Sequence, residues 1–322
     1  MPLHLTYDNT SLTDGYGAQL LRIIGVYSLA KKFHLKYVHS PIVETIEELS
    51  HKISNQKELD VLISRVNNVF QLPSDINPGK FDKTITVRSL GFKYFLMQVL
   101  KYRFSKKHVL LKILLPFPTI EKFPNSYKIA TKQIRFSNQN LFDSRPNQEL
   151  VVHVRMGYGQ NTPVAYHVRP RFLPLSYYVE LLKLLIDDDP LLHHVNLLIH
   201  TDIPINSRVW TPTSKRLRQN IEFGEHVIDG AIQVNGNDIS QNFSDLGFYS
   251  IEIISEGDFF DTFIDMANSK RLVISRSAYS YLAALFNENE VVWPSGYWHC
   301  KLSHWKSSKE IGLKTEYNLI AG

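Results

Sequence analysis

From about residue 150 the sequence alternates between short apolar runs and amphipathic helical segments. The apolar runs that are typical of strands read VVHVR, VNLLIHTD, IEIIS, RLVIS and EVVWP. Helical segments lie between them, and the clearest has Tyr178, Leu181, Leu182 and Leu185 at the i, i+3, i+4, i+7 spacing of one helix face. Strands separated by helices imply right-handed crossover connections. The sequence therefore predicts an α/β fold with a doubly wound parallel sheet in this half.

The first half of the chain is less regular. Apolar side chains on one face predict a helix from Gly17 to Phe33, and LDVLISRVNNVF predicts a second helix. Strands are expected at KYVHSPI, TITVRSL and HVLLKILL. A chain of 322 residues is long for one core. We therefore expect two domains, 1–146 and 147–322, divided where Pro and polar residues accumulate.

Composition limits the classes of partner. The net charge of +5 and the pI near 9.0 suit anionic ligands, but they are too weak to indicate nucleic acid, and no nucleic-acid-binding module is present in the sequence. The single cysteine, Cys300, favours a reducing, cytoplasmic location. No signal peptide or membrane span is expected from the sequence, so any membrane contact would be peripheral.

The segment VVHVRMG carries the strongest functional signal. Side chains alternate along a strand, so Val151, His153 and Arg155 share one face of a strand that is apolar enough to be buried. A buried guanidinium is costly unless an anion pairs with it, and its planar fork matches phosphate oxygens. A ligand phosphate is one candidate partner. A structural ion pair with a distant Asp or Glu would explain the arginine equally well.

Polar residues follow several of the predicted strands. In open parallel sheets, ligands bind beyond the carboxyl ends of the strands. The residues at these ends are Arg155, Gly157, His200, Thr201, Asp202, Ser275, Arg276 and Ser277. Asp202 suits either a ribose or sugar hydroxyl, or a cap on the following turn.

The segment RLVISRSAYSYL joins a strand to a helix through Ser275, Ser277 and Ser280. Free N–H groups at a helix start bind phosphate, and serine hydroxyls add donors. These three serines beside an arginine favour phosphate binding over a simple N-cap, which a single serine would suffice to make.

The N-terminal segment TDGYGAQLLRI is a glycine-containing turn that opens a helix. Gly15 and Gly17 match part of a dinucleotide fingerprint, but Leu20 replaces the third glycine and the preceding NTSLT is not a buried strand. An NAD-type enzyme is thus a rival hypothesis, although KYVHS lacks the acidic residue expected for it. Asp14 could serve as a general base, or it could simply belong to the turn.

A metal site is not expected. Asp187, Asp188 and Asp189 with His193 and His194 fall at the end of a helix before Pro190, where a solvated loop is the better interpretation. No zinc-binding spacing is present in the sequence.

Taken together, the motifs resemble the GT-B fucosyltransferase-like superfamily, which includes bacterial-type and plant-type fucosyltransferases, the nodulation-factor enzymes and protein O-fucosyltransferases. The HxRxG strand is matched by His153, Arg155 and Gly157, and the GxGxQ turn is similar to Gly15, Gly17 and Gln19. The segment from Ser277 to Leu282, which contains Tyr279 and Ser280, looks like the family's STFSWW-like element. All three motifs also occur in the family's order.

Two departures bear on the donor. Ala18 stands where asparagine is usual, and Met156 with Gly157 replaces the second arginine and the acid of the α-1,2 and α-1,6 types. Fucose on GDP is the first expectation. Xylose or rhamnose on a UDP-linked donor is compatible as well.

The resemblance implies two Rossmann-like domains that face a cleft, with the nucleotide-sugar donor in the C-terminal domain and the acceptor side in the N-terminal one. It further implies a metal-independent Leloir-type glycosyltransferase of glycan biosynthesis, without a cofactor, that acts on a glycan acceptor. Arg155 would hold the donor's β-phosphate, and Asp14 and His153 are the other catalytic candidates. The expected donor-binding residues are Gly15, Gly17, Gln19, Arg155, Gly157, Asp202, Ser275, Ser277, Tyr279 and Ser280. A non-catalytic nucleotide- or glycan-binding protein of the same fold is an alternative.

Overall fold

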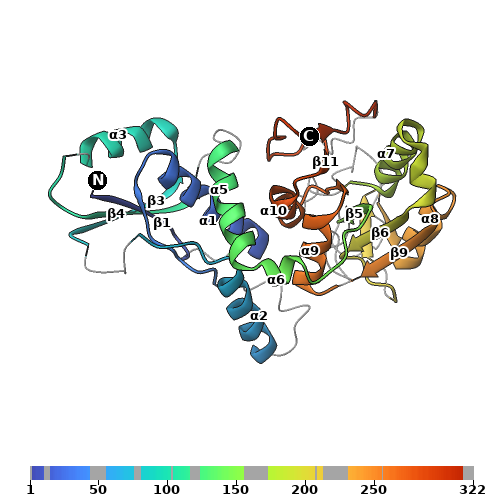
Figure 1. Ribbon diagram of the computed structural model, residues 1–322, viewed down its shortest axis with the longest axis horizontal. Helices are drawn as coiled ribbons and strands as arrows, with labels where there is room; N and C mark the ends of the chain where they lie inside the picture. Colours follow the sequence, from blue (N-terminus) through green and yellow to red (C-terminus); the bar gives the residue numbers. More distant parts are fainter. Residues whose placement is uncertain are drawn as a thin grey trace, which may run out of the picture. The chain divides into compact units, whose positions relative to one another are not determined.

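The computed structural model describes residues 2–10, 15–43, 56–75, 81–102, 104–116, 124–155, 173–206, 209–212, 231–255 and 257–314. The chain divides into two compact units, Met1–Phe142 and Asp143–Gly322 (Figure 1). The division lies four residues before the boundary that the sequence predicts. Each unit is built on its own parallel sheet, which confirms the predicted α/β class.

The first unit contains a four-stranded sheet in the order β2-β1-β4-β3. Its elements are β1 (Leu3–Tyr7), α1 (Tyr16–Lys32), β2 (Lys36–Tyr37), α2 (Gln56–Val69), β3 (Lys83–Leu90), α3 (Phe92–Tyr102), β4 (Val109–Pro116), α5 (Pro124–Ser137) and α6 (Gln139–Phe142). All its strand pairs are parallel. The helices expected at 17–33 and 59–70 and the strands expected at 84–90 and 108–115 are confirmed within a few residues.

The described residues of NTSLT, Asn9 and Thr10, are not part of a strand, and the buried strand β1 lies just upstream of them. One expectation for this unit was wrong. The strand expected over residues 36–42 stops at Tyr37. Beyond Tyr37, two backbone N–H groups donate to side chains instead of to a neighbouring strand. His39 N donates to Ser74 Oγ at 2.7 Å, and Ile42 N donates to Asn67 Oδ1 at 2.7 Å.

The second unit contains a six-stranded sheet in the order β12-β11-β10-β5-β6-β9. Its elements are β5 (Leu150–Val154), α7 (Leu175–Asp188), η2 (Pro190–His194), β6 (Asn196–Thr201), β7 (Val209–Pro212), β8 (Ala231–Val234), α8 (Gly236–Ser244), β9 (Ser250–Ser255), α9 (Phe259–Asn268), β10 (Arg271–Val273), α10 (Ala278–Phe286), β11 (Glu290–Trp293) and β12 (Lys306–Ser307). Strands β7 and β8 form a separate antiparallel pair. All five predicted strands and all three predicted helices of this half are present.

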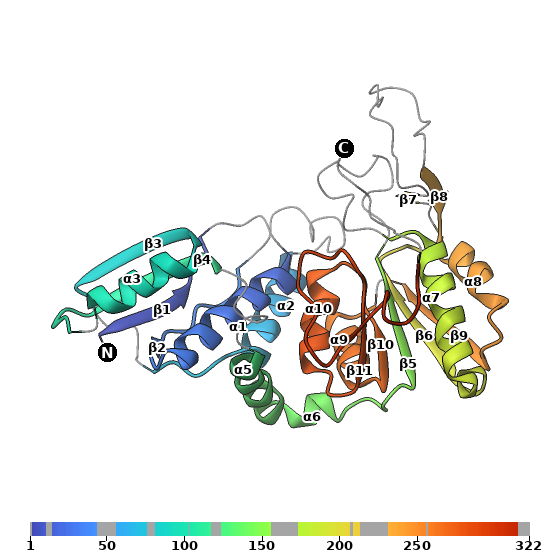
Figure 2. The same ribbon diagram turned by 90° about the horizontal axis from the view of Figure 1, so that it is seen from above.

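The strand order of the second unit identifies its topology. Counted along the chain within this unit, the sheet reads 3-2-1-4-5-6 from β9 to β12, which is the Rossmann order. Helices cover both faces, with α7 and α8 on one side of the sheet and α9 and α10 on the other (Figure 2). Leu150, Val152 and Val154 point toward the α7 side and join its apolar core. The alternate residues of β5 therefore face α9 and α10.

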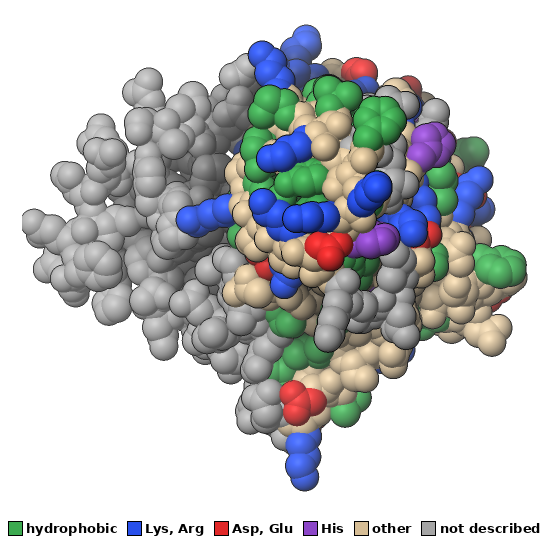
Figure 3. Space-filling view, turned by 90° about the vertical axis from the view of Figure 1, so that its left-hand side faces the viewer, with side chains coloured by type: hydrophobic (Ala, Val, Ile, Leu, Met, Phe, Trp, Pro, Cys, Tyr) green, Lys and Arg blue, Asp and Glu red, His purple; other side chains and the backbone are tan. Residues whose placement is uncertain are grey.

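The face drawn in Figure 3 shows apolar and basic side chains close together. Large apolar residues are exposed along α3, with Leu100 at 66% and Met97 at 59%. In the part of the chain that the structure describes, no helix is long and apolar enough to cross a bilayer.

Candidate functional site

The chain reverses its direction of travel across the second sheet between β5 and β10. From β5 it continues outward through β6 and β9, and it then returns to β10 on the other side of β5. In open α/β sheets the crevice at such a switch point, beyond the carboxyl ends of the strands, is where ligands bind. The residues that follow the two strands here are Arg155 and the turn from Ser275 to Ser277.

Arg155 bridges this crevice. Its Nη1 donates to Ser277 Oγ at 3.2 Å, and its Nε lies 3.8 Å from Asp202 Oδ2, beyond the end of β6. The Arg155 and Asp202 side chains keep about a fifth of their surface exposed, at 19% and 22%. An observation therefore supports each of the two interpretations of Arg155, the structural ion pair and the ligand phosphate. It has a carboxylate neighbour, and it lies at the rim where a phosphate would be held.

Ser277 begins the helix that starts at this crevice. Its Oγ accepts from the backbone N–H of Tyr279 at 3.3 Å, as an N-cap does, while it also accepts from Arg155. In both bonds the Ser277 oxygen is the acceptor, so its hydroxyl hydrogen takes part in neither.

Behind Arg155 lies a buried hydrogen-bonded chain. His153 Nδ1 is 2.7 Å from Ser275 Oγ, which in turn is 3.3 Å from Ser280 Oγ. Ser275 and Ser280 are fully buried and His153 is only 7% exposed. These side chains tie β5 to the start of α10. Of the predicted site residues, these three support the crevice from inside. Ser277 is also buried, at 2% exposed, whereas Arg155 and Asp202 line the more accessible part.

Tyr279 also lies at this junction, but its hydroxyl is directed into the protein. It donates to the backbone carbonyl of Phe259, and its ring packs on Phe259 at 4.9 Å between centroids. Burial, with Asp258 and other carboxylates nearby, raises the pKa of Tyr279 well above its ordinary value. Tyr279 thus connects α10 to α9 through its hydrogen bond and its ring contact with Phe259.

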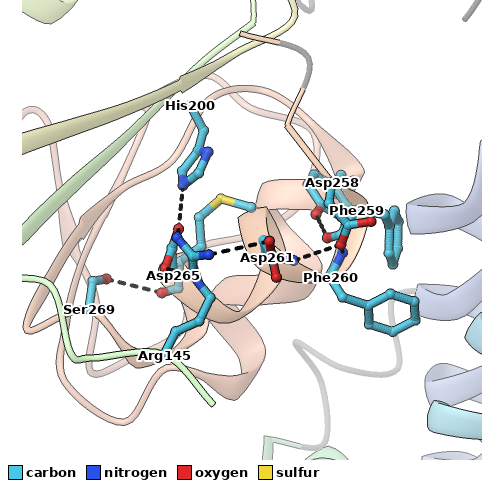
Figure 4. Close-up of polar contacts among 10 residues, drawn as sticks. Arg145, His200, Asp258, Phe259, Phe260, Asp261, Asp265 and Ser269 are labelled. Atoms are coloured by element: carbon cyan, nitrogen blue, oxygen red, sulfur yellow. Dashed lines mark hydrogen bonds and ion pairs between the residues drawn. The ribbon is translucent and has the colours of Figure 1, made fainter. Parts of the chain in front are cut away.

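A second buried network adjoins the first. His200 is the register partner of His153 on the neighbouring strand, and its Nε2 lies 3.1 Å from Asp265 Oδ2 (Figure 4). Arg145 contacts the same carboxylate, with Nε at 2.6 Å and Nη2 at 2.9 Å. Burial by itself would raise the pKa of Asp265, but the hydrogen bonds from His200 and Arg145 outweigh it and hold that pKa below its ordinary value.

Sequence analysis noted His200 as a strand-end residue, but it did not pair His200 with Asp265 and Arg145. His200 ends a predicted strand and Asp265 lies on the predicted helix, but their contact joins residues 65 positions apart. An aspartate among the apolar residues FIDMA, on a helix beside a histidine-bearing strand, is the signal that could have indicated it. Arg276 was noted only as a strand-end residue. It is 2% exposed and its Nη2 donates to Ser295 O at 2.6 Å, and burial lowers its pKa below the ordinary value.

The glycine-containing turn belongs to the first unit. Gly15 is the N-cap of α1, and its carbonyl accepts from Ala18 N and Gln19 N. Gly17 lies within α1 and is buried. The Gln19 amide exchanges hydrogen bonds with the backbone of Val43, with Nε2 to Val43 O at 3.1 Å and Val43 N to Oε1 at 3.2 Å. Gln19 thereby holds the chain after β2. Asp14 and Gly157 lie outside the described residues.

The acidic segment before Pro190 has structural partners. Asp189 caps η2 by accepting from Leu191 N at 3.3 Å, and it lies 3.3 Å from Arg271 Nη2. His193 Nδ1 lies 2.9 Å from Gly247 O. Among the described residues, no group of three or more His, Cys, Asp or Glu side chains is arranged to hold a metal ion.

Comparison with known proteins gives only weak similarities. No protein-family model matches the chain, and no curated protein matches it. Among solved structures, the chain is similar to E. coli heptosyltransferase WaaC with ADP at 11% identity, covering 97% of this chain and 96% of that one, with a TM-score of 0.40. It is also similar to POFUT1 in complex with GDP at 10% identity, covering 95% and 97%, with a TM-score of 0.45.

Proposed function

We propose that the chain is a glycosyltransferase that holds a nucleoside-diphosphate sugar at the crevice between β5 and β10. The observation that carries this proposal is the contact between Arg155 and Ser277 across the switch point of a Rossmann-ordered sheet. A guanidinium, a serine hydroxyl and the N-terminus of a nine-residue helix converge there. Each of these groups favours phosphate oxygens, and a diphosphate would use all three at once.

The same groups suit the chemistry of glycosyl transfer. When the sugar leaves, negative charge develops on the diphosphate, and donors already in place lower the energy of that state without reorganising. Arg155 would meet the β-phosphate, and Ser277 with the first N–H groups of α10 would share the charge. Asp202, 3.8 Å from Arg155, would orient the guanidinium and accept a bond from a ribose or sugar hydroxyl. The buried bond between His153 and Ser275 would keep β5 and α10 in register.

The identity of the donor follows from the motif resemblance alone. A GDP-linked sugar, fucose first, is the donor we propose, with a UDP-linked xylose or rhamnose as the alternative and a glycan hydroxyl as acceptor. We propose further that transfer needs no metal ion. Asp14 stays the candidate base for the acceptor hydroxyl. Because His153 Nδ1 already faces Ser275, we assign His153 to positioning.

Calorimetric titration of the full chain with GDP, UDP and NAD, each without added metal, tests the site. We expect saturable binding of one nucleoside diphosphate, lost in Arg155→Ala and kept in Arg65→Ala, which removes an exposed arginine of α2. Binding of NAD alone, or of a diphosphate that Arg155→Ala binds as well as the wild type, would contradict the proposal.

Transfer activity separates the enzyme from a binding protein of the same fold. We expect Arg155→Ala to lose about 2 to 5 kcal/mol of transition-state stabilisation, as when a desolvated charge partner is removed. Each 1.4 kcal/mol corresponds to about a tenfold fall in kcat/KM. The measurement is release of nucleoside diphosphate from the donor in the presence of a glycan mixture. Full activity in a folded variant, or binding without any turnover in the wild type, would rule out the catalytic role.

A further inference from the structure

Helix α3 of the first unit is apolar on its outer face as well as its inner one. Phe95, Val99 and Tyr102 are buried and pack it onto the unit. Its outer face carries Met97 and Leu100, exposed at 59% and 66%. A surface helix normally places polar residues there, so this face departs from the pattern of a helix that meets only water.

The exposed apolar side chains form one stripe that continues beyond the helix. Met97 and Leu100 are three residues apart on the same side of α3, and Phe104 follows four residues after Leu100, beyond the helix end at Tyr102. Phe104, just after α3 ends, is 87% exposed, and Tyr94 at the flank is 38% exposed. Exposed apolar side chains gathered in this way indicate an interaction site.

The chain around this stripe is strongly basic. Residues 83–120 contain no Asp or Glu, and their basic residues are Lys83, Arg88, Lys93, Lys101, Arg103, Lys106, Lys107 and Lys112. Lys93, Lys101, Lys106 and Lys107 are exposed beside the stripe. Figure 3 shows this side of the unit, where blue basic side chains lie among green apolar ones. The partner that fits it must therefore be anionic and must also accept apolar side chains.

We propose that this outer face of α3 binds the surface of an anionic lipid bilayer. Lysines attract the anionic headgroups, while Met97, Leu100 and Phe104 enter the boundary between headgroups and acyl chains. Nucleic acid would match the charge, but it offers no apolar layer to Met97, Leu100 and Phe104. A second copy of this face would match the apolar stripe, but it would bring like charges together. The proposal is independent of the proposed function.

Sedimentation of the full chain with lipid vesicles tests the proposal. The probes are vesicles of phosphatidylcholine alone and vesicles with about a third phosphatidylserine, a content that gives a negative surface potential. We expect binding only to the second kind, weakening as salt rises. Each lysine near the surface contributes about a fivefold change in partitioning, so Lys93→Gln with Lys101→Gln should weaken binding about 25-fold.

The contribution of the apolar side chains is tested with Leu100→Ser and Phe104→Ser together, which should also reduce binding to anionic vesicles at least tenfold. The matched controls lie in the second unit. Tyr249→Ser, at a residue 78% exposed, is the control for the apolar variants, and Lys183→Gln with Lys314→Gln, at two exposed lysines, is the control for the lysine variants. They should bind as the wild type does. Circular dichroism verifies that every variant is folded. The proposal is overturned if the chain does not bind anionic vesicles, if the patch variants bind as well as the controls, or if the patch instead forms a dimer in solution.

Discussion

Two aspartates on α9 contact the same arginine but lie in very different surroundings. Asp265 is fully buried between Arg145 and His200, whereas Asp261 is 55% exposed and lies 3.3 Å from Arg145 Nη1. Removing one partner of a buried pair leaves a charge without compensation, which costs about 3 to 5 kcal/mol. An exposed pair contributes about 0 to 1 kcal/mol.

We therefore expect Asp265→Ala to lower the free energy of unfolding by about 3 kcal/mol or more, and Asp261→Ala to change it by less than about 1 kcal/mol. Chemical denaturation of both variants measures the difference. Equal losses would mean that the Arg145–Asp265–His200 network does not stabilise the second unit.

His153, Arg155, Ser275 and Ser277 stood out in the sequence by their place in or just after a strand, and the structure brings them together at the crevice, but the sequence could not pair them. Their contacts join residues 122 positions apart, so they depend on β10 lying beside β5. Strand order is a property of the whole sheet, and the alternation of strands and helices does not encode it. The carboxylate near Arg155 was foreseen as a type of partner but not as Asp202.

The turn between β9 and α9 depends on a glycine. A Cβ placed on Gly257 would lie 2.7 Å from Ile254 Cγ2 and 2.8 Å from Thr262 Oγ1, closer than real side chains approach. Overpacking of this kind costs about 1 to 3 kcal/mol. Gly91, just before α3, has no atom within 4 Å of the corresponding position.

We expect Gly257→Ala to destabilise the protein by about 1 to 3 kcal/mol, and Gly91→Ala to stay within about 0.5 kcal/mol of the wild type. Thermal or urea unfolding compares the two. The steric explanation fails if Gly257→Ala unfolds at the wild-type midpoint.

Elements with a regular hydrophobic periodicity could be predicted from the sequence. The elements that were missed show where that periodicity is hidden or too short to detect. Five strands of the second sheet, β5, β6, β9, β10 and β11, lie in apolar runs of the sequence, and helical segments lie between them. Helix α3 was not expected because apolar residues on both faces hide its periodicity. Strand β1 is only five residues long, and it begins close to the chain start without a preceding turn signal.

The pH dependence of stability should differ between the units because His4 lies inside the first sheet. Burial, with the charges of Lys36 and His108 nearby, lowers the pKa of His4 from 6.5 to about 4. The unfolded chain takes up this proton near pH 6.5, but the folded chain does so only near pH 4. Stability is therefore fully present above pH 6.5 and is lost as pH falls to about 4, by about 3 kcal/mol.

Urea unfolding between pH 7 and pH 4 measures this loss. We expect His4→Gln to reduce the slope in that window, whatever its effect at neutral pH, whereas His194→Gln, at an exposed histidine, should keep the wild-type slope. An unchanged slope in His4→Gln would show that other groups account for the acid sensitivity.

The division into two α/β units could be anticipated from length and pattern, because each sheet needs its own core. The activity is harder to predict, since the same Rossmann order serves many chemistries. What distinguishes this chain is the set of groups at one crevice. We therefore propose a location for the diphosphate, at the carboxyl ends of β5 and β10 in the second unit.

Hydrogen–deuterium exchange of the full chain, with and without the nucleoside diphosphate that binds, tests that location most directly. We predict slower exchange at residues 150–155 and 275–282, and no such change there in Arg155→Ala. Protection at residues 15–20 with no change at β5 and α10 would contradict the account and place the nucleotide at the glycine-containing turn instead.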